Sequence, residues 1–240
     1  MTDETRTPTP IDTIADAWVD TLAELEPTLA TYIGRAEFND RFGDYSPAGQ
    51  ERLTAEGRKT LAALAAATPV DDIDAVTKED LAREIELGLE LDEAKWHLRD
   101  INVIASHPQN IRSAFDLMPT ADVDDWSVIS TRLGAVAPAI DGYIESLRTG
   151  IQQGVVPARR QVVEVVTQIG RYTEDGGFFA TFAAEAAPAE GQLPASLARD
   201  LSDNANAARV AYDRLAEFLG SELAPAASEK DAVGRELYAL

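Results

Sequence analysis

The spacing of apolar residues most constrains what this 240-residue chain can fold into. Near the start of the chain the apolar side chains recur at intervals of three and four, as in Ile14, Trp18, Leu22 and Leu25. Such intervals place side chains on one face of an α-helix, whereas a half-buried strand needs strict alternation. The same spacing continues along most of the chain, and no stretch alternates convincingly. We therefore predict an all-α fold, a multi-helix array that resembles a bundle.

Proline, glycine and serine indicate where several helices begin and end. Pro27 should end or kink the first helix one residue earlier, because the residue before a proline avoids helical geometry. Ser46 should cap a second helix, with Pro47 in its first turn. Gly154 should close a pair of helices, and a long helix should follow Pro194. The chain should therefore consist of helices joined by short loops.

The charge of the chain excludes several classes of partner. The 42 acidic and 21 basic side chains give a net charge of −21. Such a field repels phosphate backbones and anionic lipids, so we expect no nucleic-acid partner and no membrane partner. The chain has no cysteine, which excludes disulfides and fits a cytoplasmic location. The polar start lacks a signal core, and no run reaches the ~18 apolar residues of a membrane span.

The two ends of the chain set the expected domain boundaries. Residues 1–10, MTDETRTPTP, should form a disordered tail, and residues 11–240 should form one helical domain. The final residues begin an apolar helical face, at Val233, Leu237, Tyr238 and Leu240. Two interpretations follow from this pattern. Either the domain is truncated at its C-terminus, or a short terminal helix docks this apolar face on the rest of the domain.

A third helix, expected over about residues 78–100 behind a capping box at Thr77 and Asp80, carries a candidate site. Four ionisable side chains follow one another at intervals of four, three and four: Glu86, Glu90, Glu93 and His97. That spacing places them on one stripe of the helix. Carboxylates and a histidine on one stripe could hold a metal inside a bundle.

The known metal motifs are absent, however. A di-iron bundle needs Glu-x-x-His on each of two helices, and a zinc protease needs H-E-x-x-H or a close variant. Neither histidine of this chain is followed by glutamate. No nucleophile elbow, P-loop or dinucleotide-binding fingerprint is present either. We therefore predict no catalytic residue and no metal ligand in this chain, and we interpret the stripe as solvated or as lining a cavity.

The second histidine lies at a helix start. Ser106 and Gln109 match the capping box S-x-x-Q, and Pro108 suits the first turn. Local helix chemistry therefore explains these residues and predicts His107 near the surface. Arg112 has no local explanation; it could bind a carboxylate or form a surface ion pair.

Several segments of the sequence together resemble the N-terminal half of the bacterial family known as domain of unknown function 885. The resemblance covers roughly residues 11–240 and is carried by DYSPAGQERL, TKEDLAREIELGLELDEAKWHLRDINVIASHPQNIRSAFDLMP, RLGAVAPAIDGYIESLRTGIQQGVVPARRQV and DAVGRELYAL. Members of the family look like zinc-dependent peptidases or carboxypeptidases, are about twice as long, and carry a His-Glu metal motif in the C-terminal half. Their N-terminal helices form part of the wall of a deep cleft. This chain has no position that matches that metal motif.

The resemblance implies a non-catalytic N-terminal portion of a zinc-peptidase-like protein, part of a larger helical fold. In the intact parent this portion would contribute cleft wall, with Glu86, Glu90, Glu93, His97 and Arg112 as candidates. Zinc would belong to the parent, and the expected partners are a C-terminal catalytic half, a second copy of the chain, or a peptide substrate. One alternative is a stand-alone acidic helical interaction module, and another is an autonomous metalloenzyme.

Overall fold

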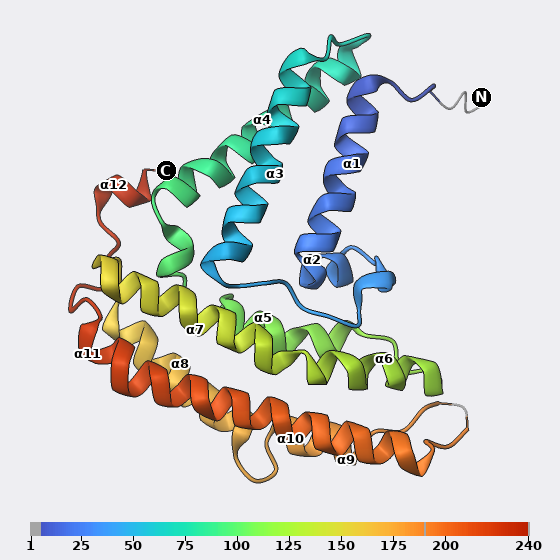
Figure 1. Cartoon of the computed structure of the whole chain (residues 1–240), viewed down its shortest axis with the longest axis vertical. Coiled ribbons are helices and arrows are strands. Elements are labelled where there is room, and N and C mark those ends of the chain that lie inside the picture. Colours follow the sequence, from blue (N-terminus) through green and yellow to red (C-terminus); the bar gives the residue numbers. More distant parts are fainter. Residues whose placement is uncertain (1–5, 190, 240) are drawn as a thin grey trace.

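The computed structural model describes residues 6–189 and 191–239, in which a group of steep helices stands on a layer of long helices (Figure 1). The upper group contains α1 (Pro10–Leu25), α3 (Pro47–Ala66) and α4 (Asp72–Glu93). A small core of Trp18, Leu64 and Ile85 joins them, with one side chain from each helix. These three positions lie on the apolar stripes of their helices, so the periodicity of the sequence explains this packing.

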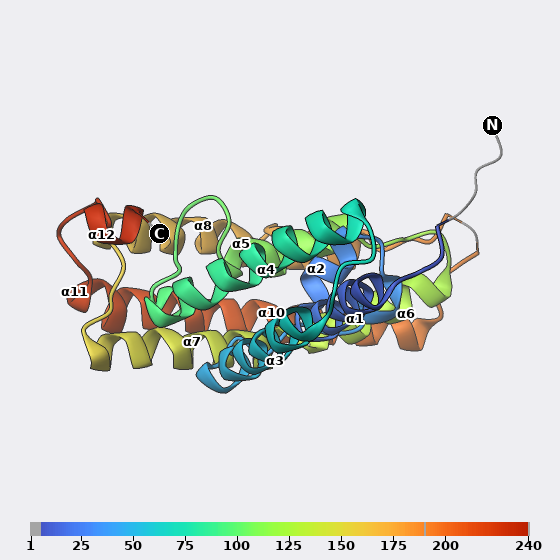
Figure 2. The same cartoon turned by 90° about the horizontal axis from the view of Figure 1, so that it is seen from above.

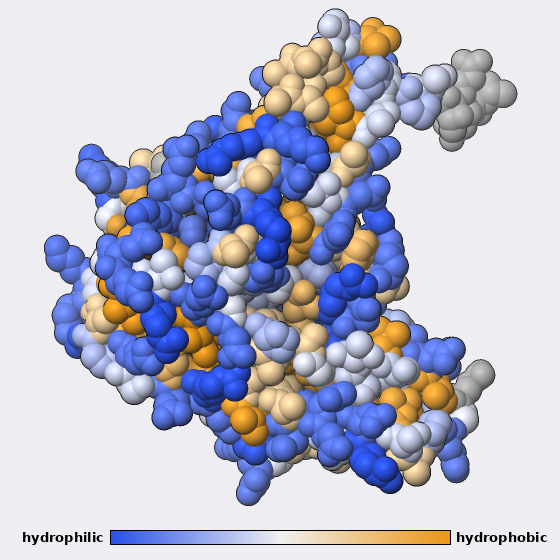
Figure 3. All heavy atoms as spheres, in the orientation of Figure 1, coloured by the Kyte–Doolittle hydropathy of each residue, from blue (hydrophilic) through white to orange (hydrophobic). Residues whose placement is uncertain are grey.

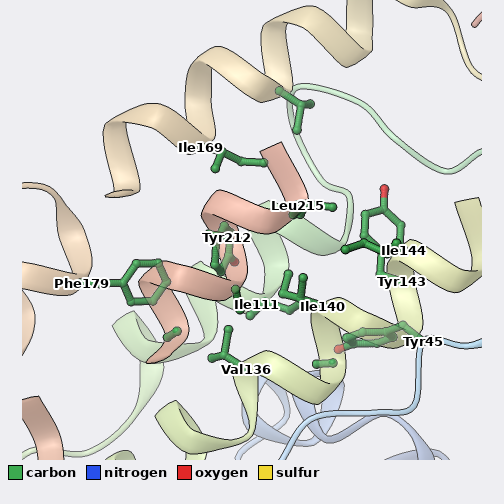
Figure 4. Close-up of a cluster of buried hydrophobic side chains, with 14 of the residues drawn as sticks. Tyr45, Ile111, Val136, Ile140, Tyr143, Ile144, Ile169, Phe179, Tyr212 and Leu215 are labelled. Atoms are coloured by element: carbon green, nitrogen blue, oxygen red, sulfur yellow. The ribbon is translucent and has the colours of Figure 1, made fainter. Parts of the chain in front are cut away.

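The lower layer is built around α10 (Ala195–Phe218), which packs against four other helices. These are α6 (Val123–Gly134), α7 (Val136–Gln153), α8 (Arg159–Thr173) and α9 (Phe178–Ala184). Figure 4 shows Tyr212 and Leu215 of α10 among Ile140 of α7, Ile169 of α8 and Phe179 of α9. All five are buried. Burial of such side chains supplies roughly 1.5–3 kcal/mol each, which makes this layer the main core.

Short helical segments connect the long helices. They are α2 (Pro27–Tyr32), η1 (Ala36–Phe38), η2 (Trp96–Leu98), α5 (His107–Ser113), η3 (Ala114–Leu117), the π-helical turn η4 (Leu219–Leu223), α11 (Ala224–Ala226) and α12 (Arg235–Tyr238). Within residues 6–189 and 191–239 there is no strand, only an isolated bridge between Ala158 and Ser228. The predicted all-α fold is therefore confirmed. None of the helices described is both long and apolar enough to cross a membrane.

Several predicted boundaries are confirmed. Helix α1 ends at Leu25 and Pro27 begins α2. Ser46 caps α3, where its Oγ accepts the Gly49 N–H at 3.2 Å. Gly154 adopts φ +70° and ends α7, a left-handed conformation that glycine adopts without a steric penalty.

The predicted third helix is wrong at both ends. Helix α4 begins at Asp72, because the Asp71 carboxylate accepts the Asp74 N–H at 2.9 Å and caps the helix earlier than expected. Thr77 therefore lies inside α4 and forms no cap. At the other end α4 stops at Glu93, and Lys95 adopts φ +58°. That left-handed residue turns the chain away before His97, which lies in η2.

The structure also revises the expected disordered tail. Residues 1–5 lie outside the described residues, whereas the chain from Arg6 onward is placed. Arg6 pairs with Asp12 at 2.6 Å, with Asp71 at 2.7 Å and with Asp74. Thr9 caps α1 and donates its hydroxyl to the buried Asp74 at 2.7 Å. Residues 6–10 thus tie the start of α1 to the start of α4 and are not a free tail.

The last helix, α12, covers only part of the apolar face expected for it: Leu237 is half-buried. Val233 is 51% exposed and Tyr238 is 86% exposed. Leu240 lies outside the described residues. The interpretation in which a short terminal helix buries this face is therefore not what the structure shows.

One face of α7 lets two other segments lie directly on its backbone. Gly142, Ser146 and Gly150 follow at intervals of four and form this face. A Cβ at Gly142 would lie 2.9 Å from the Ser46 nitrogen, and one at Gly150 would collide with the carbonyl oxygen of Leu98. Between them Ser146 Oγ donates to the Tyr45 carbonyl at 2.7 Å. Seen from above, α3 crosses over the lower layer at this helix (Figure 2).

Replacing Gly150 by alanine should test how closely the Leu98 segment lies on α7. We expect Gly150→Ala to destabilise the fold by about 1–3 kcal/mol, because the added methyl group meets backbone oxygens, that of Val155 at 2.6 Å among them. Gly88→Ala is the control: Gly88 lies within α4 and nothing would contact its methyl group. The control should stabilise the fold by up to about 1 kcal/mol. Urea unfolding of both variants measures the difference, and equal stabilities would contradict the packing.

Candidate functional site

The two layers enclose a cavity of about 220 Å³ where the lower ends of α1 and α3 approach α5 and α7. Its walls come from segments far apart in the sequence (Figure 1). Both histidines of the chain line it. We call it the interlayer pocket and define it by Glu26, Asp44, Tyr45, His97, His107 and Ser146.

Glu26 enters the pocket because helix α1 ends there. Pro27 has no N–H to continue α1, so the chain turns at Glu26, whose N–H still bonds Leu22 O at 2.7 Å. Its carboxylate lies beside Gly43 and receives no hydrogen bond from any group in the described part of the chain. Burial raises the pKa of Glu26 to about 7. This carboxyl group is therefore close to half ionised at neutral pH.

Tyr45 and His107 form a stacked pair in the pocket wall. Their ring centroids are 4.0 Å apart, and the His107 ring also meets Tyr143 edge-on at 4.9 Å. The Tyr45 hydroxyl lies 3.2 Å from Thr28 Oγ1. Burial lowers the pKa of His107 to about 4. The imidazole is consequently neutral at pH 7, with one nitrogen free to accept a hydrogen bond.

The local helix start orients His107 inward. The predicted capping box is present, and Gln109 Oε1 accepts the Ser106 N–H at 3.1 Å. Gln109 Nε2 also donates to Gln168 at 2.7 Å, which fixes α5 on α8. The predicted capping box is confirmed, and His107 is half-buried, with its ring packed against Tyr45 and Tyr143. The reason is tertiary: the Tyr45 segment covers this end of α5.

His97 reaches the pocket from η2. Its Nδ1 lies 3.2 Å from Asp92 Oδ1, but the two groups are not aligned for a hydrogen bond, so this buried nitrogen has no partner among the described residues. Burial lowers the pKa of His97, and Lys95 lowers it further, while Asp92 opposes both. The pocket thus holds a second imidazole that favours the neutral form.

The rim of the pocket carries a satisfied ion pair. Asp44 accepts the Ser46 N–H at 3.0 Å and pairs with Arg52 at 2.6 Å. Hydrogen bonds from Ser46 and then from Arg52 hold the pKa of Asp44 below its usual value. Asp44 is therefore ionised and already compensated, in contrast to Glu26.

The structure does not bring the predicted stripe together. Glu86, Glu90 and Glu93 are exposed on α4, and none of them lines the interlayer pocket. The helix ends before His97, so the expected alignment of His97 with these carboxylates was wrong. Among the five candidates from the sequence, His97 is the one that lines this pocket.

Arg112 also lies elsewhere. It pairs with Asp116 one turn later on the chain, and its guanidinium lies 4.1 Å from the centroid of the Phe178 ring. This position matches the surface ion pair that the sequence offered as an alternative to a carboxylate site.

Sequence reasoning missed Glu26 and Tyr45, which belong to no motif. The one available signal was a carboxylate placed directly before Pro27 at a helix break.

The residues described do not fit a zinc site. Within them no three histidine or carboxylate groups converge closely enough to hold a metal ion. His97, His107 and Glu26 share a cavity without meeting this condition. A zinc ion with protein ligands needs three or four such groups around one point.

Glu26→Gln should change stability in a pH-dependent way. The fold raises the pKa of Glu26 from 4.5 to about 7, so it favours the protonated form. The stabilisation from that proton is complete below pH 4.5 and is lost as pH rises to about 7. Glutamine mimics the protonated form. We expect little effect at pH 4.5 and stabilisation on the order of 1–3 kcal/mol at pH 8, measured by urea unfolding.

Glu51→Gln is the matched control for this charge change, because Glu51 is exposed on α3 and lies outside the pocket. Its effect on the free energy of unfolding should not vary with pH in the same range. A pH-independent effect of Glu26→Gln would mean that its carboxyl group reaches solvent.

The imidazole of His107 should titrate near pH 4 in the folded chain. The fold lowers this pKa from 6.5, so the stability contributed by the neutral ring is lost as pH falls from 6.5 towards 4. Imidazole proton resonances measured against pH give the midpoint, and a His97→Asn variant assigns the two signals. A titration midpoint of His107 near pH 6.5 would show that its ring is exposed to solvent.

The comparisons with known proteins come from the family pattern and from solved structures. A crystal structure described as "the putative lipoprotein from Colwellia psychrerythraea" matches 92% of this chain with a TM-score of 0.70 at 15% sequence identity. This chain spans 42% of that structure's length. The likeness concerns the fold alone at this identity. No curated protein matches the sequence. The pattern of the family described as "Bacterial protein of unknown function (DUF885)" matches residues 27–240, so the chain belongs to that family.

Proposed function

We propose that this chain is the non-catalytic, substrate-binding N-terminal portion of a zinc-peptidase-like protein, and that the interlayer pocket is its part of the cleft wall. The observation that carries the proposal is the pocket itself. It gathers both histidines and an unpaired carboxylate from separate segments, although no motif in the sequence links them. Ionisable groups with shifted pKa values in a cavity are typical of functional sites.

The proposed role is binding and orientation of a peptide. Two neutral imidazoles, the Tyr45–Thr28 hydroxyl pair and Glu26 offer hydrogen-bonding groups around a small cavity. The described residues form no group that could hold a metal ion, so we assign the zinc chemistry implied by the family resemblance to a C-terminal portion. That portion and the cytoplasmic location stay predictions. A chain that spans 42% of a similar structure is consistent with such a division.

Direct assays of the purified chain test this function. We expect short peptides to perturb the imidazole resonances of His97 and His107, with no peptide hydrolysis and no stoichiometric zinc after dialysis against zinc. Mass spectrometry measures hydrolysis and elemental analysis measures metal. Turnover with one bound zinc would identify an autonomous metalloenzyme and contradict the proposal. Peptides that leave both imidazoles unchanged would also contradict it.

A second candidate function, the acidic interaction module, has one observation in its favour. Val70 lies just before α4, and Ile73 and Val76 lie in its first turns; they are 71%, 59% and 59% exposed. Figure 3 shows apolar residues at this end of the molecule. Exposed apolar side chains with a helical spacing are typical of a docking face. If Ile73→Ser abolished the binding of a partner and Glu26→Gln did not, that result would favour the interaction module.

A further inference from the structure

We infer that the interlayer pocket accepts a positively charged amine, a primary ammonium group that pairs with the Glu26 carboxylate. The inference rests on the proposed function and names the ligand chemistry of the same pocket. The group could be the α-ammonium of a peptide or the side-chain ammonium of a lysine. These two sources share the chemistry that the pocket recognises.

The charges around the pocket leave Glu26 as its uncompensated group. Asp44 is paired with Arg52 on the rim, and Glu24 lies on the rim as well. Lys95, which lies near His97, donates to Gln153 at 2.7 Å. Another nearby cation, Arg132, is fully buried behind Phe42, with its guanidinium 4.6 Å from the ring centroid. It donates to Thr31 Oγ1 at 2.7 Å and does not reach Glu26.

The hydrogen-bonding groups of the pocket call for a ligand that donates. A carboxylate only accepts hydrogen bonds, and a neutral imidazole presents one accepting nitrogen. The described residues supply no donor to Glu26. A primary ammonium carries three donors and no acceptor. It would therefore supply the donors that Glu26 lacks, whereas a second carboxylate would add an uncompensated charge.

Size and electrostatics agree with this assignment. A cavity of about 220 Å³ is smaller than the ~300–1,000 Å³ of sites that enclose a whole small molecule. It suits one end of a ligand. The net charge of −21 also attracts cations to the molecule as a whole. A test must therefore separate pairing with Glu26 from this general attraction.

The chain's own histidines provide the readout. Since both of them line the pocket, their imidazole resonances report its occupancy without a label. At pH 7 the full chain is titrated with four probes: alaninamide, Nα-acetyl-lysinamide, N-acetylalaninamide and N-acetylalanine. The first two carry an α-ammonium and a side-chain ammonium, the third is neutral, and the fourth is an anion. We expect saturable shifts of both imidazoles with at least one cationic probe, at an affinity at least tenfold above that of the neutral or anionic probe.

The pH dependence supplies an independent check. The pKa of Glu26 is about 7 in the free chain, and a cation binds the ionised form. Binding of Nα-acetyl-lysinamide, whose amine stays charged from pH 5 to 8, should therefore weaken about tenfold per pH unit below 7 and release a proton. Calorimetry in two buffers of different ionisation enthalpy measures that proton.

Two variants decide whether Glu26 is the partner. Glu26→Gln should lower the affinity for the cationic probe at least tenfold, and Glu51→Gln, which removes the same charge outside the pocket, should change it less than twofold. Equal losses in the two variants, or a neutral probe that binds as well as a cation, would overturn the inference. If neutral peptides bind and cations do not, the pocket remains a peptide site and the amine inference alone fails. If no probe moves either imidazole, both proposals fail.

Discussion

The close contact between α7 and the segments that cross it is the constraint on which the rest of the structure depends. Gly142, Ser146 and Gly150 present almost no side chain, so backbone lies against backbone at Ser46 and at Leu98. Ser146 fixes the register by its hydrogen bond to Tyr45. Because the Tyr45 segment and η2 both lie on this face, Tyr45 and His97 reach the same cavity. Larger residues at these positions would separate the layers, and the pocket would no longer form.

The energetics of the pocket differ from those of the surrounding surface. Most ion pairs, such as Arg41–Asp40 and Arg209–Asp213, are exposed and contribute little to stability. Glu26 is instead half-buried without a compensating cation, which disfavours its charged form. A half-buried carboxylate that lacks a partner and lowers stability is typical of a functional position. A ligand that supplies the missing partner is the explanation that the other groups of the pocket support.

The sequence predicted local features well and the site poorly. Gly154 ends α7 and Ser46 caps α3, as predicted, because each of these signals acts within one turn of helix. The stripe from Glu86 to His97 was a reasonable extension of the same logic. It failed because Lys95 adopts a left-handed conformation and ends the helical register before His97. No residue type in that stretch forbids another turn of helix, so the end of α4 is decided by its packing.

By itself, the sequence determined the helical class, the main apolar stripes and the family, because periodicity and local motifs depend on residues that are close together in the sequence. It also determined that the chain carries a large negative charge and only two histidines. Only the tertiary structure decided that both histidines face one cavity with Glu26 and Tyr45. These residues lie up to 81 positions apart, from Glu26 to His107. Their meeting depends on how two helical layers stack, and no spacing along the chain encodes that arrangement.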